Sequence, residues 1–185
     1  GGSITGQVSF TTENINAPAL INQLNRTNPD IAFIAAQPDE AADIIRALRG
    51  AGFTKPIIGG DSYDSARIYD LSPSEKAKIY FTTHALLTPT SQNPEIELFI
   101  NQYKSRYGEG PTSAFAALGY DAIRLASLAL ANAHSMEPSA IRSALESIRG
   151  YPGVTGTISY GPTQHIPQKS VTIVTFENGI PTRAQ

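Results

Sequence analysis

The chain has 185 residues, of which 41% are hydrophobic and 16% charged, and its formal net charge is −2. This length and apolar content are sufficient for the core of one large domain or two small ones. The near-neutral charge and the lack of a basic stripe interleaved with aromatic residues argue against nucleic acid as a partner, and the absence of cysteine excludes disulfides, thiolate metal sites and cysteine nucleophiles.

In the first part of the chain, strand-like and helix-like segments alternate. Short apolar or β-branched runs predict strands, and apolar residues at helical spacing predict helices. The expected strands are residues 4–11, 29–36, 55–60 and 78–84, and the expected helices are 16–28, 39–52 and 72–78. Strands such as 29–36 are of the continuously apolar type that is buried on both faces of a parallel sheet. The β-α-β order therefore predicts an α/β fold, with a doubly wound, mostly parallel sheet.

After residue 92 the predicted elements no longer alternate: helices come first and a β-hairpin follows them, which indicates a second structural unit. The expected helices are 93–108, 113–133 and 138–150, and the expected strands are 156–160 and 169–176, with turns at 161–167 and 177–181. The helix at 113–133 is long enough to cross a membrane. Asp121 and Arg124 lie inside it and much of its apolar content is alanine, so a buried helix is the prediction.

Candidate binding residues follow the predicted parallel strands at the points where they end. In open α/β sheets, ligands bind beyond the carboxyl ends of the strands. The candidates are Gln37, Pro38, Asp39 and Glu40 after the strand at 29–36, Asp61, Ser62 and Tyr63 after the strand at 55–60, and His84 after the strand at 78–84. The β-α-β order predicts that all of them lie along one rim of the sheet.

Most of these residues also have a structural interpretation. Asp39 and Glu40 are most simply the first-turn acids of the helix that follows them. Asp61 and Ser62 fit an Asx-type turn or the cap of a short helix over residues 64–71, and Tyr63 could cover an apolar edge. Local rules alone leave both interpretations open for these three residues.

The sequence carries no signature of a common catalytic or cofactor site. It contains no G-x-x-x-x-G-K-[ST], no G-x-G-x-x-G after a strand, no H-E-x-x-H and no G-x-S-x-G motif. His84 has no companion at ligand-like spacing and is more often structural. The adjacent Asp61 and Ser62 could not be bridged by one histidine in the order that a catalytic triad requires. We therefore expect no catalytic residue, no metal site and no cofactor.

Three stretches carry a resemblance to a known family. They are residues 16–62, which end in a Gly-Gly-acid turn, residues 107–133, which contain the triplet Tyr120-Asp121-Ala122, and residues 141–162, which contain GVTGTISY. Together they resemble the periplasmic solute-binding proteins of ABC importers, of the branched-chain amino acid type, within the type I periplasmic-binding superfamily. The resemblance covers nearly the whole chain, although no single motif is as diagnostic as a metal site.

The resemblance implies a two-lobe protein that binds its ligand between the lobes and performs no catalysis. Residues 1–84 would form part of the C-terminal lobe, and residues 85–160 would supply helices and a strand of the N-terminal lobe. Residues 161–185 would form a terminal hairpin that returns at the hinge. The implied ligand is an amino acid, an amide or a small carboxylate.

The resemblance also assigns roles to individual residues. Asp61 matches the acid that pairs with the ammonium of an amino-acid ligand, a contact that is strong because it is charge-assisted. Gln37 and Pro38 stand where the family often has an aromatic residue. Phe115 matches an aromatic residue near the start of the long helix, and His84 would lie near the cleft mouth.

The implied partners are a small-molecule ligand and the membrane permease of an importer. The implied location is periplasmic or extracellular, with a lipid anchor as one option. The chain begins without methionine and matches the family from the second strand of the second lobe, so we expect a fragment that pairs with an upstream fragment or with a second copy. The alternative functions are the effector-binding core of a transcription regulator and a sensory receptor with the same fold.

Overall fold

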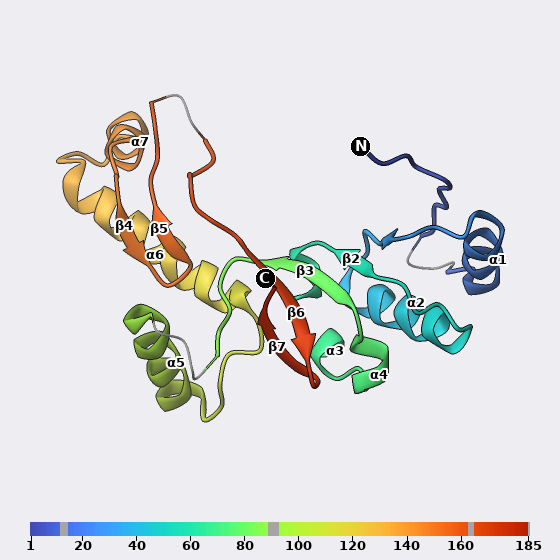
Figure 1. The fold of residues 1–185 in the computed structure, drawn as a ribbon. Helices are drawn as coiled ribbons and strands as arrows, with labels where there is room; N and C mark the ends of the chain where they lie inside the picture. The colour runs from blue at the N-terminus through green and yellow to red at the C-terminus, as the bar shows by residue number, and fades with distance from the viewer. Residues whose placement is uncertain (12–14, 89–92, 163–164, 185) are drawn as a thin grey trace. The chain divides into compact units, whose positions relative to one another are not determined.

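The fold is that of a computed structural model, which describes residues 1–11, 15–88, 93–162 and 165–184. The chain divides into two compact units (Figure 1). Unit 1 consists of Gly1–Thr83 and Ile173–Gln185, and unit 2 of His84–Thr172. The assignment of residues 1–84, 85–160 and 161–185 to lobes of a longer protein stays a prediction. Of the turn expected at 161–167, residues 163–164 lie outside the described residues.

Unit 1 is built on a sheet with the strand order β1-β2-β3-β6-β7. Its strands are β1 (Ala32–Phe33), β2 (Ile57–Gly59), β3 (Ile79–Thr83), β6 (Thr172–Glu177) and β7 (Ile180–Arg183). The first three are paired in parallel, with Ala32 opposite Ile57 and Ile57 opposite Ile79, and β6 and β7 form an antiparallel hairpin. The predicted α/β class with a mostly parallel sheet is confirmed.

In the sequence, one helix of unit 1 precedes β1, and the other helical elements lie between β1 and β3. They are α1 (Ala17–Thr27), α2 (Pro38–Gly50), the 3-10 turn η1 (Asp61–Tyr63), α3 (Ala66–Tyr69) and α4 (Pro73–Lys76). Helix α2 begins with a proline, carries two acids in its first turn and has Arg49 in its last, an order that complements the helix dipole. Its buried face includes Ile44, Ile45 and Leu48, and it contacts α1, α3 and α4.

Two strand predictions in unit 1 are wrong in extent. Residues 4–10 are not in a strand and are almost all exposed, because a run of strand-forming residues is not stable without a partner strand. The strand expected at 29–36 is reduced to Ala32–Phe33, and it is buried on one face only, since the Phe33 side chain is 69% exposed. β1 ends the strand order of the sheet, and an apolar run cannot by itself reveal such a position.

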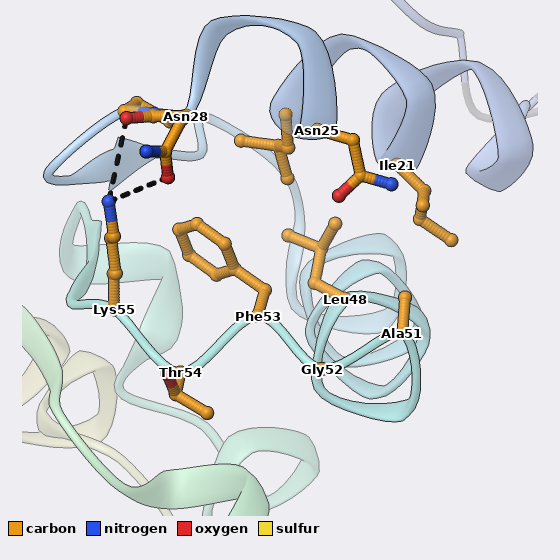
Figure 2. Close-up of a pocket in the computed structure, with 11 residues that line it drawn as sticks. Ile21, Asn25, Asn28, Leu48, Ala51, Gly52, Phe53, Thr54 and Lys55 are labelled. Carbon is orange, nitrogen blue, oxygen red and sulfur yellow. Dashed lines mark hydrogen bonds between the residues drawn. The ribbon is translucent and has the colours of Figure 1, made fainter.

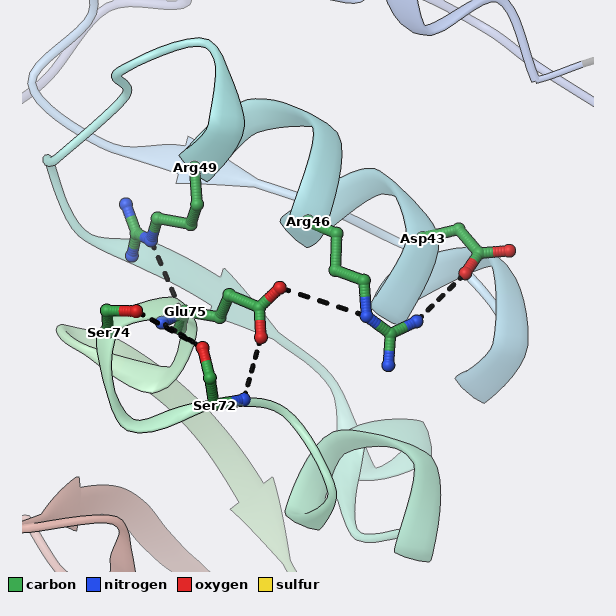
Figure 3. A network of polar contacts seen from close by, with 6 residues as sticks. All are labelled: Asp43, Arg46, Arg49, Ser72, Ser74 and Glu75. Atoms are coloured by element: carbon green, nitrogen blue, oxygen red, sulfur yellow. Dashed lines mark hydrogen bonds and ion pairs between the residues drawn. The ribbon is translucent and has the colours of Figure 1, made fainter.

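Arginine side chains of α2 connect that helix to the segment around α4 (Figure 3). Ser72 and Glu75 form the predicted capping box of α4, and Arg46 lies 3.8 Å from the Glu75 carboxylate. Arg49 donates hydrogen bonds to the backbone oxygens of Phe53, Lys55, Glu75 and Ala77. The Arg49 guanidinium therefore fixes the end of α2 against the loops that lead into β2 and β3.

Unit 2 contains three helices and a two-stranded sheet in the part of the chain that the structure describes. The elements are α5 (Pro94–Tyr107), α6 (Ala114–Asn132), α7 (Pro138–Glu146), β4 (Tyr151–Gly153) and β5 (Gly156–Ile158), and the two strands are antiparallel. The predicted signals of α5 are confirmed: the Asn93 side chain caps its start, and Gly108 ends it with a φ of 82°. The strand β4 was not predicted, because its three residues include a proline and a glycine.

Helix α6 is anchored by its aspartate. Asp121 is 2% exposed and accepts hydrogen bonds from the backbone N–H groups of Val154 (3.0 Å) and Thr155 (2.8 Å) and from the Thr155 hydroxyl (2.8 Å). A Cβ atom at position 153 would lie 2.7 Å from the Asp121 carboxylate, so the close approach requires Gly153. The Tyr-Asp-Ala triplet and the Gly-Val-Thr stretch of the sequence therefore form one buried contact.

The prediction that α6 is buried holds for one face only. Ala117, Leu125 and Ala129 are buried, whereas the side chains of Phe115 and Ile123 are 49% and 70% exposed. By length and composition alone, α6 is a helix that could cross a membrane, and 28% of the apolar window is buried inside the molecule. The buried hydrogen bonds of Asp121 connect this helix to the β4–β5 turn.

Replacing Arg49 with methionine is expected to destabilise unit 1 by about 2 kcal/mol, because four backbone oxygens lose a charged donor. The matched control is Arg46→Met on the same helix, whose partners Asp43 and Glu75 are exposed or partly exposed and whose loss should cost less than about 1 kcal/mol. Urea unfolding followed by circular dichroism measures both. Equal losses in the two variants would contradict the anchoring role of Arg49.

Candidate functional site

A pocket of about 720 Å³ opens at the carboxyl ends of β1 and β2. Because these strands are parallel, the segments that leave them emerge at the same edge of the sheet. The lining residues are Phe10, Thr11, Phe33, Ala35, Ala36, Gln37, Glu40, Gly60, Asp61 and Ser62. The pocket therefore brings together four of the candidate residues named from the sequence, Gln37, Glu40, Asp61 and Ser62, and all of its lining belongs to unit 1.

The residues that follow β2 form a 3-10 turn that is attached to the end of β1. The Ser62 hydroxyl donates a hydrogen bond to the backbone oxygen of Ala36 at 2.8 Å. This bond joins the two loops that form the pocket edge. The Ser62 side chain therefore has a structural task whether or not it also contacts a ligand.

Tyr63 points into the core and is not among the lining residues of the pocket. Its side chain is fully buried, and its hydroxyl donates a hydrogen bond to the backbone oxygen of Ile34 at 3.2 Å. Burial raises the pKa of this hydroxyl, so it stays a protonated donor. A Cβ atom at Gly59 would lie 2.4 Å from the tyrosine ring, so the ring lies directly against the Gly59 backbone. Of the two interpretations of Tyr63, its burial favours the structural one.

The second aspartate after β2 is also structural. Asp64 is 4% exposed and accepts hydrogen bonds from the Tyr69 hydroxyl, at 2.6 Å, and from the Thr83 hydroxyl. These bonds connect the turn to α3 and to the end of β3. Desolvation and the neighbouring Asp64 carboxylate raise the pKa of Tyr69, which keeps its hydroxyl a donor.

The segment after β1 leads directly into α2. Gln37 precedes the helix in an extended conformation, with φ −69° and ψ 164°, and its side chain makes no capping hydrogen bond. It is exposed and lines the pocket. Pro38 is the first residue of α2 and is not among the lining residues. Its proposed ligand contact stays a prediction.

Glu40 lines the pocket, although the sequence favours a structural role for it over a binding one. It was assigned as a first-turn acid of α2, yet it is only 9% exposed, and its Oε2 atom has no hydrogen-bond partner among the described residues. The signal was present in its position: the third residue of a helix directs its side chain back toward the helix start, and here that start is the pocket edge.

Among the described residues, the ionisable side chains of the pocket lining are Glu40 and Asp61, and no lysine, arginine or histidine of this part of the chain lines the pocket. Phe10, Phe33 and Ala35 supply apolar surface. Such a lining can accept hydrogen bonds from a cationic group while covering an apolar group beside it.

A second pocket, of about 190 Å³, lies at the opposite end of β2, beside the loop that precedes the strand (Figure 2). Its lining includes the apolar residues Ile21, Leu48 and Phe53 and the polar residues Asn25, Asn28 and Lys55. The Lys55 ammonium donates to the Asn28 side chain at 2.9 Å and lies 4.0 Å from Asp30. Because ligands of open α/β sheets bind at the carboxyl ends of the strands, the pocket with Asp61 is the stronger candidate.

The remaining two sequence candidates belong to unit 2. His84 is its first residue and is partly buried, and Phe115 is the second residue of α6 and is 49% exposed. Their proposed ligand contacts stay predictions.

Comparison with known proteins identifies relatives over nearly the whole chain. The family model described as periplasmic binding protein matches residues 1–180. The Leu/Ile/Val-binding protein BraC3 of Rhizobium johnstonii is 21% identical over 181 residues, which cover 96% of this chain and 48% of that protein.

Solved structures of similar proteins also match nearly the whole chain. The leucine-binding protein LivK of Thermotoga maritima is 29% identical with a TM-score of 0.84, over 96% of this chain and 50% of that one. The branched-chain amino acid transporter substrate-binding protein LivJ of Streptococcus pneumoniae, solved in complex with isoleucine, is 26% identical with a TM-score of 0.77, over 93% of this chain and 48% of that one. The chain thus spans about half the length of these relatives.

Replacing Gly59 with alanine is expected to cost about 1–3 kcal/mol, because the new methyl group would overlap the buried Tyr63 ring. The adjacent Gly60→Ala is the matched control: Gly60 has a φ of −85°, and a Cβ there meets nothing within 4 Å. That change should alter stability by less than about 0.5 kcal/mol. Thermal and urea unfolding of both variants measure the difference in stability. Similar losses of stability in the two variants would show that the close contact between Gly59 and the Tyr63 ring does not exclude a side chain at position 59.

Proposed function

The chain belongs to the periplasmic binding protein family, and we propose that it is part of the ligand-binding receptor component of an ABC importer. Its ligand is a small solute, an amino acid, an amide or a small carboxylate, which is held between two lobes without chemical change. The observation that carries this proposal is the pocket at the carboxyl ends of β1 and β2, with Asp61 in its lining.

The chemistry of the pocket supports an amino-acid ligand in particular. The Asp61 carboxylate lines a pocket of about 720 Å³ that also offers the Gln37 side chain and the apolar surface of Phe33. An ammonium group paired with Asp61 forms a charge-assisted hydrogen bond, which strengthens when water is excluded from the site. The names of BraC3, LivK and LivJ, which refer to branched-chain amino acids, favour the same ligand class.

The remaining parts of the proposal concern the rest of the receptor, because the chain spans about half the length of its relatives. In a two-lobe receptor, unit 1 contributes to the C-terminal lobe, and the helices of unit 2 contribute to the N-terminal lobe. The second wall of the cleft is then supplied by an upstream segment or by a second copy of the chain. A membrane permease is the proposed downstream partner, and the proposed location is periplasmic or extracellular, with a lipid anchor as one option.

Asp61→Asn is expected to weaken amino-acid binding by about 1.5–3 kcal/mol, because a neutral amide replaces the charged acceptor of the ammonium group. The measurement is a thermal-shift and titration series on the complete protein that contains this chain, with L-leucine, L-isoleucine, L-valine and a panel of amides and aromatic acids. At least one of these solutes must raise the melting temperature of the wild type for the comparison of variants to be made.

Asp70→Asn is the matched control for this series, because Asp70 is an exposed acid that follows α3 and is absent from the pocket lining. It should bind the same solutes as the wild type does. If Asp61→Asn bound amino acids with unchanged affinity, Asp61 would be a turn residue and not a ligand contact. No shift with any solute of the panel would reject the receptor function.

The chain expressed alone is expected to associate with itself or with the upstream fragment. The reason is that β1 is the last strand at one side of the unit 1 sheet and is flanked by exposed residues, so its outer edge can pair with a strand of another chain. Sedimentation velocity over a range of concentrations measures this. Adding the separately expressed upstream fragment should convert self-associated chains into a defined complex. A monomer with sharp spectra at low concentration would contradict the expectation.

A further inference from the structure

We propose that Lys169 is a positioning residue for the link between the two units, because its ammonium group holds the segment that returns from unit 2 to unit 1. Bending of the chain at this crossing is then confined to Ser170 and Val171. The inference goes beyond the proposed function, since it concerns how the chain passes from one unit to the other and not which solute is bound.

The chain passes between the units twice. Unit 1 ends at Thr83 and unit 2 begins at His84, and unit 2 ends at Thr172 before unit 1 resumes at Ile173. When two compact bodies move, the few residues that connect them absorb the change in backbone dihedral angles. Which residues can bend therefore depends on where the chain is held on either side of each crossing.

On the unit 2 side, the returning segment is held against the residues around β5. Gln168 and Ser159 exchange two backbone hydrogen bonds, of 2.7 and 3.1 Å. The next residue, Lys169, donates a hydrogen bond from its ammonium group to the Thr155 hydroxyl at 2.7 Å. Two consecutive residues thus attach this segment to unit 2, one through its backbone and one through its side chain.

The lysine contact continues into the interior of unit 2. The Thr155 hydroxyl donates to the buried Asp121 carboxylate at 2.8 Å, so its oxygen is left to accept from the Lys169 ammonium. Lys169 is partly buried, and desolvation lowers the pKa of its ammonium group, although the Asp121 carboxylate opposes that shift. The returning segment is therefore connected through one hydroxyl to helix α6, which carries Asp121.

Beyond Lys169 the chain becomes exposed before it enters the sheet of unit 1. Ser170 is exposed, and the Val171 side chain is 54% exposed. Strand β6 begins at Thr172, and Val174 on it is fully buried. Two residues, Ser170 and Val171, therefore separate the lysine contact from β6.

The other crossing has the same organisation. The Thr83 hydroxyl, on the last residue of unit 1, donates to the buried Asp64 carboxylate. Ala85 is 6% exposed and belongs to the apolar core of unit 2 with Phe99 and Val154. His84 alone lies between these two attachments. At both crossings, a side-chain contact that ends on a buried carboxylate lies next to a link of one or two residues.

Lys169→Met in the complete protein that contains this chain tests the proposal, because it removes the ammonium group and keeps an unbranched side chain. Amide hydrogen exchange of Ser159 and Gln168 should become about tenfold faster or more, since a charge-assisted contact beside their paired backbones is lost. The link itself is measured by electron–electron distance spectroscopy between spin labels on cysteines introduced at Asp70 in unit 1 and Ser139 in unit 2, both exposed. The distribution of distances should become broader in Lys169→Met.

Lys104→Met is the matched control, since Lys104 is an exposed lysine in the last turn of α5, in the same unit. It should change neither measurement. Thr155→Val removes the hydroxyl that accepts from Lys169, so it should change both measurements in the same direction. The double variant should exchange within about twofold of the faster single variant, because both substitutions break one contact. Thr155→Val also gives the result if Lys169→Met does not fold.

The outcomes are separate from those that test the proposed function, because neither measurement requires a bound solute. Exchange rates and distance distributions equal to those of the wild type in Lys169→Met and Thr155→Val would overturn the inference. Faster exchange with an unchanged distance distribution would show that the lysine stabilises unit 2 alone, and would overturn its role in the link.

Discussion

The candidate site depends on the contact between the backbone of Gly59 and the ring of Tyr63. The ring is fully buried against the last residue of β2, in a space that a Cβ atom at position 59 would occupy. The Tyr63 hydroxyl bonds to Ile34, and the neighbouring Ser62 hydroxyl bonds to Ala36, so the same turn is attached to both sides of the β1 end. Asp61 lines the pocket because the two residues after it are held in place.

Buried carboxylates organise both units, and they differ in how their charge is compensated. Asp64 is held by two hydroxyl groups, and Asp121 by two backbone N–H groups and a hydroxyl. These two acids join segments that are distant in the sequence, and their burial is accounted for within the chain. Glu40 is similarly buried, but its Oε2 atom has no such donor among the described residues.

The errors of sequence-based prediction concern residues whose environment is set by distant partners. Residues 4–11 have the composition of a strand, but strand formation needs a neighbouring strand, which local composition does not report. Phe33 belongs to an apolar run that suggested burial on both faces, yet it lies on β1 at the end of the strand order and is exposed beside the pocket. In contrast, the helix signals of Asn93, Gly108, Ser72 and Glu75 act within one turn and were predicted correctly.

The sequence by itself determined the alternation of helices and strands in residues 16–84, the starts of α4 and α5, and the edge of the sheet at which polar residues gather. These features follow from periodicity and capping, which operate over a few residues. Only the tertiary structure decided which of those polar residues face the pocket. It placed Tyr63 and Asp64 in the interior and left Asp61, Gln37 and Glu40 at the pocket. The physical reason is that a side chain's surroundings depend on the packing of segments that are far apart in the chain, and no local pattern encodes that packing.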